Sequence, residues 1–212
     1  MRVVVLISGR GSNMQALLEA GLPVEFACVI SNKPEAAGLA IASQLGVATA
    51  VVDHRLHPDR KDFDAALAKE IDRHQPDLVI LAGFMRVLTE SFVRHYENRL
   101  INIHPALLPA FPGLNTHARA IAAGVKLHGC SVHFVTPEVD AGPIIAQAAV
   151  PVLAQDTPQT LAARVLRQEH RLFPMAVRWL AQGLVQFRDD GTAVIAAGGT
   201  DAEDKALIFP QS

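Results

Sequence analysis

The chain has 212 residues, of which 50% are hydrophobic, 19% are charged and 5% are aromatic. This apolar share is too high for a disordered chain, and the length is enough for one large folded domain or two small ones. Nineteen Lys and Arg residues against 21 Asp and Glu residues give a net charge of −2 without a basic run, which argues against nucleic-acid binding as the main activity.

The first apolar stretch, residues 3–7, covers only five residues before Ser8 and Gly9. A membrane span needs roughly 20 apolar residues, and the stretch is also too short for a signal peptide. We therefore expect a cytoplasmic chain without a membrane partner. Cys28 and Cys130 lie in apolar runs typical of buried strands, so we expect both to pack in the core instead of forming a disulfide or a zinc site.

The first half of the chain alternates apolar runs with helix-like stretches. These patterns predict strands at 3–7, 24–30, 48–52 and 77–83, and helices at 12–20, 35–45 and 59–73. Runs that are apolar on both faces and are separated by helices indicate parallel strands covered on both sides. The sequence therefore predicts an α/β fold with a doubly wound, mostly parallel twisted sheet of the Rossmann-like kind.

The pattern changes in the second half, where we expect an antiparallel C-terminal part. The predicted elements are a strand at 99–105, a Pro-rich loop at 106–115, a short helix at 116–124, strands at 128–135 and 143–152, a helix from Thr157 as N-cap to about Leu180, and a hairpin at 184–195. Without a repeat or linker, we expect a single domain over 1–212. It would comprise a phosphate-binding α/β half at 1–100, a second half at 101–182, and a terminal hairpin and tail at 183–212.

A glycine-rich loop, Ser-Gly-Arg-Gly-Ser-Asn at residues 8–13, joins the first predicted strand to the first helix. Backbone N–H groups and the helix dipole favour an anion there, and phosphate is the obvious ligand. Neither a nicotinamide fingerprint nor a P-loop fits, because Met14 replaces a required glycine, residues 30–32 include no acidic residue, and no Gly-Lys-Ser/Thr follows. A side chain at Gly11 would block approach to the phosphate and leave the fold intact. The alternative, a structural turn with Ser12 as N-cap, stays open.

A polar pair interrupts the apolar strand at 99–105. Strand periodicity places Asn102 and His104 on one face, at the carboxyl end of the strand, where open α/β sheets build their sites. A carboxylate, Asp140, follows another apolar strand on a tight turn. An Asn, a His and an Asp together with an anion loop suit acyl transfer. The alternative for the polar pair is a buried, hydrogen-bonded arrangement without a catalytic role.

Five of the nine histidines lie between positions 95 and 133, which raises the question of a metal site. No HExxH or comparable helical spacing occurs, His133 alternates with apolar residues as core histidines do, and His128 opens a strand. We therefore expect no metal. A Ser or Cys nucleophile is also unsupported, because no G-x-S-x-G elbow occurs and neither cysteine adjoins a histidine.

Several separated motifs give the chain a specific resemblance. It resembles the folate-dependent phosphoribosylglycinamide formyltransferases of the purine pathway from Val3 to about Leu180. The matching motifs are VLISGRGSNMQAL, SNKPEAAGL, LAGFMRVL, LINIHPALLPAFPGLNTH, HGCSVHFVTPEVDAGPII and the QEH of the last long helix. The resemblance implies formyl transfer from 10-formyltetrahydrofolate to the amine of 5-phosphoribosylglycinamide in de novo purine biosynthesis, without a metal.

The resemblance also implies roles for individual residues, carried over by motif. The catalytic residues would be Asn102, His104 and Asp140. The ribosyl phosphate would be bound by Gly11, Ser12 and Asn13, and the ribose hydroxyls by Glu169. The folate cleft would be lined by Met85, Arg86, Val87, Leu88, Asn102 and the 135–140 segment, with Arg60 as a looser match near the folate tail.

The chain departs from the family pattern at Arg10, Ala106 and Ala141, none of which belongs to the catalytic trio. Related methionyl-tRNA formyltransferases carry an extra C-terminal domain and formyltetrahydrofolate hydrolases an extra N-terminal one, so both fit this sequence less well. A sugar N-formyltransferase, which should lack the phosphate loop, and a non-catalytic phosphate-ligand sensor remain as alternatives. The sequence leaves open whether the chain is a monomer or a homodimer, and what Arg10 does.

Overall fold

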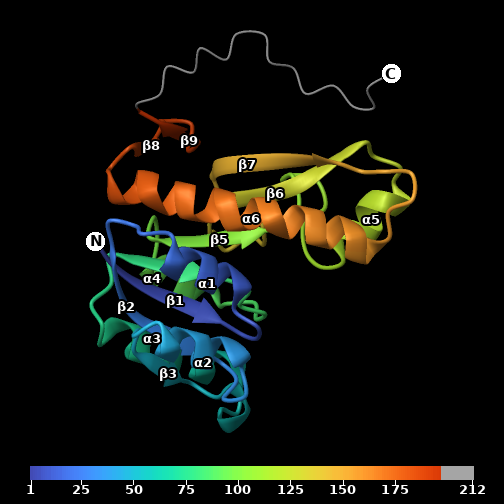
Figure 1. The fold of residues 1–212 in the computed structure, drawn as a ribbon. Helices are drawn as coiled ribbons and strands as arrows, with labels where there is room; N and C mark the ends of the chain where they lie inside the picture. The colour runs from blue at the N-terminus through green and yellow to red at the C-terminus, as the bar shows by residue number, and fades with distance from the viewer. Residues whose placement is uncertain (197–212) are drawn as a thin grey trace.

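The computed structural model describes residues 1–196, and Figure 1 shows their arrangement. In the first half, strands β1 (Arg2–Ile7), β2 (Glu25–Ser31), β3 (Thr49–Val51), β4 (Leu78–Leu81) and β5 (Leu100–His104) alternate with helices α1 (Ser12–Glu19), α2 (Ala37–Gln44), α3 (Arg60–Asp72) and α4 (Glu90–His95), and with the 3-10 helix η1 (His54–Leu56). The second half contains α5 (Thr116–Ala122), β6 (Leu127–Phe134), β7 (Ile144–Pro151), α6 (Pro158–Ala181), β8 (Val185–Phe187) and β9 (Ala193–Ile195).

The strands predicted from the sequence for the main sheet are confirmed, and their ends differ by at most two residues. Helices η1 and α4 were not among the predicted elements. The sequence held a signal for α4, because the Thr89 side chain caps its first turn and Glu90 follows, which is the pattern of a helix N-terminus. The predicted hairpin is present as β8 and β9, whereas the predicted tail lies outside the described residues.

Seven strands form one sheet in the order β3-β2-β1-β4-β5-β6-β7. Strands β1 to β5 pair in parallel, whereas β5 with β6 and β6 with β7 pair antiparallel. This confirms the doubly wound, mostly parallel sheet with an antiparallel C-terminal part. The strand order reverses between β1 and β4, and ligand sites of open α/β sheets lie at such a switch point, beyond the carboxyl ends of the strands.

Helices cover both faces of the sheet (Figure 1). One apolar cluster joins α1, α2, α5 and α6 to one face, and a second joins α3 and α4 to the other. Ile101 and Ile103 belong to the first cluster, so the alternation of β5 directs Asn102 and His104 to the opposite face, as predicted. Cys28 and Cys130 are buried with free thiols, which confirms their expected place in the core.

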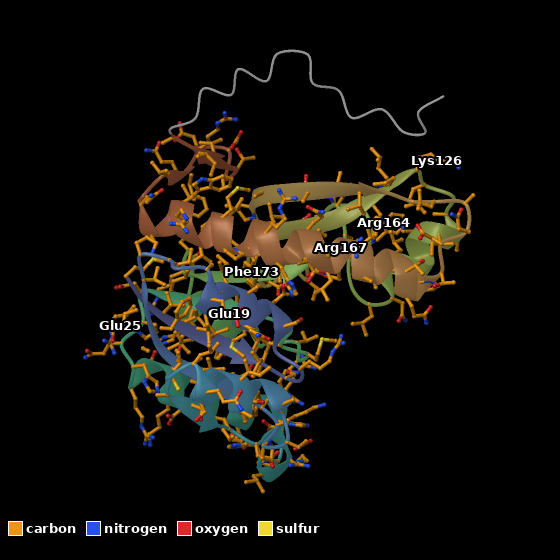
Figure 2. All side chains as sticks on the ribbon, in the orientation of Figure 1. Glu19, Glu25, Lys126, Arg164, Arg167 and Phe173 are labelled. Carbon is orange, nitrogen blue, oxygen red and sulfur yellow. The ribbon has the colours of Figure 1, made fainter. Side chains whose placement is uncertain are left out.

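The long helix α6 crosses the sheet face beside α1 (Figure 1). Thr157 and Thr160 form a capping box at its start, and Pro158 occupies its first turn, as the sequence indicates. Phe173 is fully buried between α6 and α1 (Figure 2). The 24 residues of α6 span roughly 36 Å, so this one helix reaches from β6 and β7 to α1, the first helix of the chain. Within residues 1–196, none of the helices has the length and apolar character that crossing a membrane requires.

Candidate active site

The glycine-rich loop leads directly into α1. Its N-cap is Gly11, in the left-handed region with φ 76°, and within residues 1–196 no side chain caps the helix. The alternative that placed Ser12 as N-cap is therefore wrong in this detail, because Ser12 is already the first helical residue. The first N–H groups of a helix have no partner within it, so an uncapped α1 leaves these donors for a ligand.

The conformation of Gly11 has a structural reason that the sequence did not reveal. A Cβ built there would lie 2.8 Å from the backbone Cα of Gly38 on α2 and 2.9 Å from Met14 Cε. The loop is also bound to α2 by the Gly38 N–H, which donates to the Gly9 carbonyl at 3.0 Å. The expectation that a Gly11 side chain would leave the fold intact is therefore wrong, because it would collide with α2. At Gly9, by contrast, a Cβ meets no atom within 4 Å.

A cavity of about 320 Å³ opens beside this loop. Its walls come from the loop, from the segment after β4 and from α6. The lining residues are Ser8, Gly9, Arg10, Gly11, Ser12, Asn13, Ala82, Gly83, Met85, Leu166 and Glu169. The residues predicted from the resemblance to hold a ribosyl phosphate and ribose hydroxyls thus line one cavity.

Asn13 and Glu169 are in direct contact although 156 positions separate them. Asn13 Nδ2 donates to Glu169 Oε2 at 2.6 Å, and Asn13 Oδ1 is buried without a hydrogen-bond partner among the described residues. Glu169 is 7% exposed, and burial raises the pKa of its carboxyl while the bond from Asn13 opposes that rise. A polar ligand group in the cavity could satisfy these buried atoms.

Strand β5 lies two strands from the strand that leads into the glycine-rich loop. Leu6, Leu81 and Asn102 are in register across β1, β4 and β5, so Ser8 and His104 each lie two residues further along. Two strand spacings correspond to roughly 10 Å. The loop and the polar strand therefore meet at the carboxyl edge, on both sides of the switch point.

His104 is 5% exposed and lies between two acceptors. Its Nδ1 lies 3.3 Å from Asp140 Oδ2, and its Nε2 lies 3.0 Å from the carbonyl oxygen of Phe111 in the Pro-rich loop. An imidazole can donate from both nitrogens only when both are protonated. His104 therefore has an acceptor oxygen within reach of each ring nitrogen.

Asp140 reaches His104 from the loop between β6 and β7. It adopts a left-handed conformation with φ 55°, and its Oδ2 also accepts the Gly113 backbone N–H at 2.8 Å. Gly142 makes the tight return possible, since a Cβ there would lie 1.9 Å from the Phe134 carbonyl oxygen. The structure therefore brings Asn102, His104 and Asp140 together in one corner, as predicted.

His133 also belongs to this corner, which the sequence analysis missed. It pairs with Asn102 across β5 and β6, and Asn102 Nδ2 lies 3.2 Å from its Nε2. Its Nδ1 lies 2.8 Å from the Phe134 carbonyl oxygen, so Nδ1 carries the hydrogen and Nε2 accepts. Burial lowers the pKa of His133, in keeping with a neutral ring. The prediction of a core histidine is correct for its burial and incomplete for its contacts.

The segment 85–88 forms an exposed, partly apolar lip after β4. Met85 and Val87 are 65% and 55% exposed. The Arg86 guanidinium lies 4.9 Å above the Phe63 ring, and its buried Nε has no hydrogen-bond partner within residues 1–196. Arg60 is exposed at the start of α3, and the described part of the chain shows no hydrogen bond or ion pair between it and segment 85–88.

Comparison with known proteins agrees with this geometry. Residues 1–177 match the family described as Formyl transferase. The phosphoribosylglycinamide formyltransferase of Escherichia coli (strain K12) is 47% identical over 194 residues, which cover 90% of this chain and 92% of that protein. The trifunctional purine biosynthetic protein adenosine-3 of Homo sapiens is 46% identical over 194 residues, covering 90% of this chain and 19% of that protein.

Solved structures give the same result for the fold. The crystal structure of glycinamide ribonucleotide transformylase 1 from Symbiobacterium toebii has a TM-score of 0.89 and 46% identity, covering 93% of this chain and 94% of that one. The phosphoribosylglycinamide formyltransferase from Anaplasma phagocytophilum has a TM-score of 0.88 and 47% identity, covering 93% and 95%. With the family match over most of its length, the chain belongs to the formyl transferase family.

Proposed function

We propose that this chain transfers the formyl group of 10-formyltetrahydrofolate to the amine of 5-phosphoribosylglycinamide, in purine biosynthesis. The observation that carries the proposal is the meeting of two features at one sheet edge. An uncapped helix N-terminus opens onto a cavity with a buried carboxylate, and Asn102, His104 and Asp140 lie two strands away. The relatives named above act on this ribonucleotide or take part in purine biosynthesis according to their names.

The ribonucleotide would bind in the cavity beside the phosphate loop. Its phosphate would accept hydrogen bonds from the backbone N–H groups at Gly11, Ser12 and Asn13, which α1 leaves unpaired. Its ribose hydroxyls would bind Glu169, whose position is fixed by Asn13. The glycinamide amine would then extend along the sheet edge towards β5.

The formyl donor would bind between segment 85–88 and segment 135–140. The exposed side chains of Met85 and Val87, together with Leu88, would supply apolar surface for the ring system, and Asn102 would line the same cleft. Arg86 presents a buried Nε that has no hydrogen-bond partner among the described residues, and this suits an anionic group of the folate tail. We propose Arg60 as a second, more exposed contact to that tail.

The chemistry requires a neutral amine to attack the formyl carbon, after which the formyl oxygen gathers negative charge. His104, held as imidazolium by Asp140, would donate to this oxygen, which would replace the Phe111 carbonyl as the acceptor at Nε2. One N–H of Asn102 is directed to His133, so its second N–H is free for the same oxygen. Asp140 would accept the amine proton, directly or through water. The tetrahedral intermediate would then collapse by breaking the bond between the formyl carbon and the folate nitrogen, and that nitrogen would take up a proton and leave as tetrahydrofolate. None of these steps needs a metal.

An assay of formyl transfer tests the proposal. Mixing the chain with 10-formyltetrahydrofolate and 5-phosphoribosylglycinamide should change the ultraviolet absorbance of the folate and produce the formylated ribonucleotide, and a chelator should not affect the rate. Absence of turnover with this ribonucleotide, but transfer to an amino sugar, would favour a sugar N-formyltransferase. Ribonucleotide binding without any turnover would favour a phosphate-ligand sensor.

We further propose that residues 1–212 act as a single formyltransferase domain in the cytoplasm, as a monomer or a homodimer. The continuous seven-stranded sheet, shared by both halves of the chain, supports the single domain. Sedimentation of the active protein would determine its oligomeric state, and cell fractionation its location.

A further inference from the structure

A short chain of hydrogen bonds crosses the carboxyl edge of three adjacent strands. Asn32 follows β2, Ser8 follows β1 and Met85 follows β4. The Ser8 hydroxyl donates to Asn32 Oδ1 at 2.6 Å and accepts the Met85 backbone N–H at 2.8 Å. Ser8 and Asn32 are only 6% and 1% exposed, so water competes little for these bonds.

The direction of the Ser8 hydroxyl is set by Asn32. An amide oxygen can only accept, so the hydroxyl hydrogen points to Asn32 and a lone pair remains for Met85. Asn32 is itself held in place, because its backbone carbonyl accepts from His54 Nδ1 at 2.8 Å and from the His54 backbone N–H at 3.3 Å. The hydroxyl therefore joins segments on both sides of the switch point.

We propose that Ser8 is a positioning residue that couples the binding of the two substrates. It belongs to the loop proposed to hold the phosphate, and it fixes the backbone of Met85, the first residue of the lip proposed to line the folate cleft. A phosphate bound to the loop restrains Ser8, and the hydroxyl passes this restraint to segment 85–88. Because segment 85–88 is then already held in place, a bound ribonucleotide should tighten folate binding. Such coupling is reciprocal, so bound folate should tighten ribonucleotide binding by the same factor. The inference rests on the proposed function.

Titration calorimetry tests this coupling. The dissociation constant of tetrahydrofolate, the deformylated product, is measured with and without saturating 5-phosphoribosylglycinamide. In the native chain we expect the ribonucleotide to tighten tetrahydrofolate binding by roughly five- to tenfold. Ser8→Ala should abolish this tightening, and Ser8→Thr, which keeps a hydroxyl, should restore at least part of it. Ser8→Cys should give an intermediate effect, because sulfur is a weak acceptor.

The matched control is Ser31→Ala. Ser31 is fully buried and adjoins Asn32, but its hydroxyl bonds locally to the backbone of Lys33. This variant should keep the native coupling. Thermal melting shows which variants fold. If Ser8→Ala does not fold, the coupling is tested with Ser8→Cys instead.

Two results would overturn the inference. One is a folded Ser8→Ala or Ser8→Cys chain with full coupling. The other is a native chain that transfers the formyl group but binds tetrahydrofolate equally well with and without the ribonucleotide, which would refute the coupling and leave the proposed function in place. A native chain that transfers no formyl group would refute the proposed function, and the inference with it.

Discussion

The glycine-rich loop, residues 8–13, and strand β5 share one edge of the sheet, but they are built differently. The loop offers backbone N–H groups, and its shape depends on close contact between Gly11 and Gly38. Strand β5 offers side chains, and their arrangement depends on residues from the Pro-rich loop, β6 and the β6–β7 loop. A site built from backbone N–H groups should keep its function when side chains are replaced and lose it when the backbone conformation changes. A site built from side chains should lose its function when those side chains are replaced.

The largest effect is expected on the side-chain half. His104→Gln removes the proposed cationic donor and should lower kcat by about 10²- to 10³-fold. Because the ring is replaced by a polar group of similar reach, the variant should still fold. Steady-state kinetics with a thermal melt measures both quantities. His95→Gln, an exposed change on α4, is the control, and a similar loss of kcat in both variants would contradict the assignment.

The second prediction concerns the path of the loop. Gly11→Ala places a Cβ against Gly38 and requires positive φ, so it should lower the free energy of unfolding by about 2–3 kcal/mol. Gly9→Ala meets open space and should change it by less than about 0.5 kcal/mol. Urea unfolding of the two variants compares them directly. Equal losses would mean that contact with α2 does not shape the loop.

The third prediction uses the pH dependence of stability to distinguish the surroundings of β5 from the glycine-rich loop. Burial, together with repulsion from His117 and His104, lowers the pKa of His128 to about 4. The unfolded chain protonates this ring near pH 6.5, so between pH 6.5 and 4 it binds more protons than the folded chain. Stability should therefore fall as the pH falls through this window, by about 3 kcal/mol from this group.

Replacing His128 with Gln should flatten the pH dependence of the urea midpoint between pH 6.5 and 4. His128 packs against Phe111 of the Pro-rich loop, with ring centroids 5.8 Å apart, so this acid sensitivity arises beside the residues proposed to be catalytic. The glycine-rich loop contains no side chain that titrates in this range. An unchanged slope in His128→Gln would show that other groups dominate.

The smallest effect is expected at Glu169, the proposed partner of the ribose hydroxyls. Glu169→Gln keeps a partner for Asn13 but loses the charge proposed to bind the ribose hydroxyls. KM for the ribonucleotide should rise roughly tenfold, or about 1.4 kcal/mol, while kcat changes little. Thermal stability should not fall, because burial already disfavours the charged carboxylate. Glu19→Gln, on the exposed face of α1 (Figure 2), is the control.

The sequence predicted most of the fold because its signals are local. Apolar runs of β1, β2 and β4 are bounded by turns and separated by helical periods, and the alternation of β5 is visible within five residues. The antiparallel addition of β6 and β7 also followed from the changed spacing. Helix α4 was not predicted, because its six residues are too few to show a periodic pattern.

The candidate site was harder to predict from the sequence than the fold, because its contacts join residues that lie far apart along the chain. Nothing near Asn13 indicates that its amide binds Glu169, and nothing near His133 shows that its ring faces Asn102. Alternation identified His133 only as buried. Gly11 was correctly singled out, but the reason lies in Gly38, which only the packing of α2 against the loop reveals.

The left-handed backbone of Asp140 restricts which residues can occupy this position. Positive φ is easy for Gly, tolerable for Asn and Asp, and costly for most others. Of the three, only Asp carries a carboxylate, so conformation and chemistry together leave a single choice. Asp140→Glu preserves the charge but adds backbone strain and a longer side chain. Asp140→Asn removes the charge but fits the left-handed backbone, so for the structure Asn is the more conservative replacement. An acid in this turn cannot be replaced by the other acid.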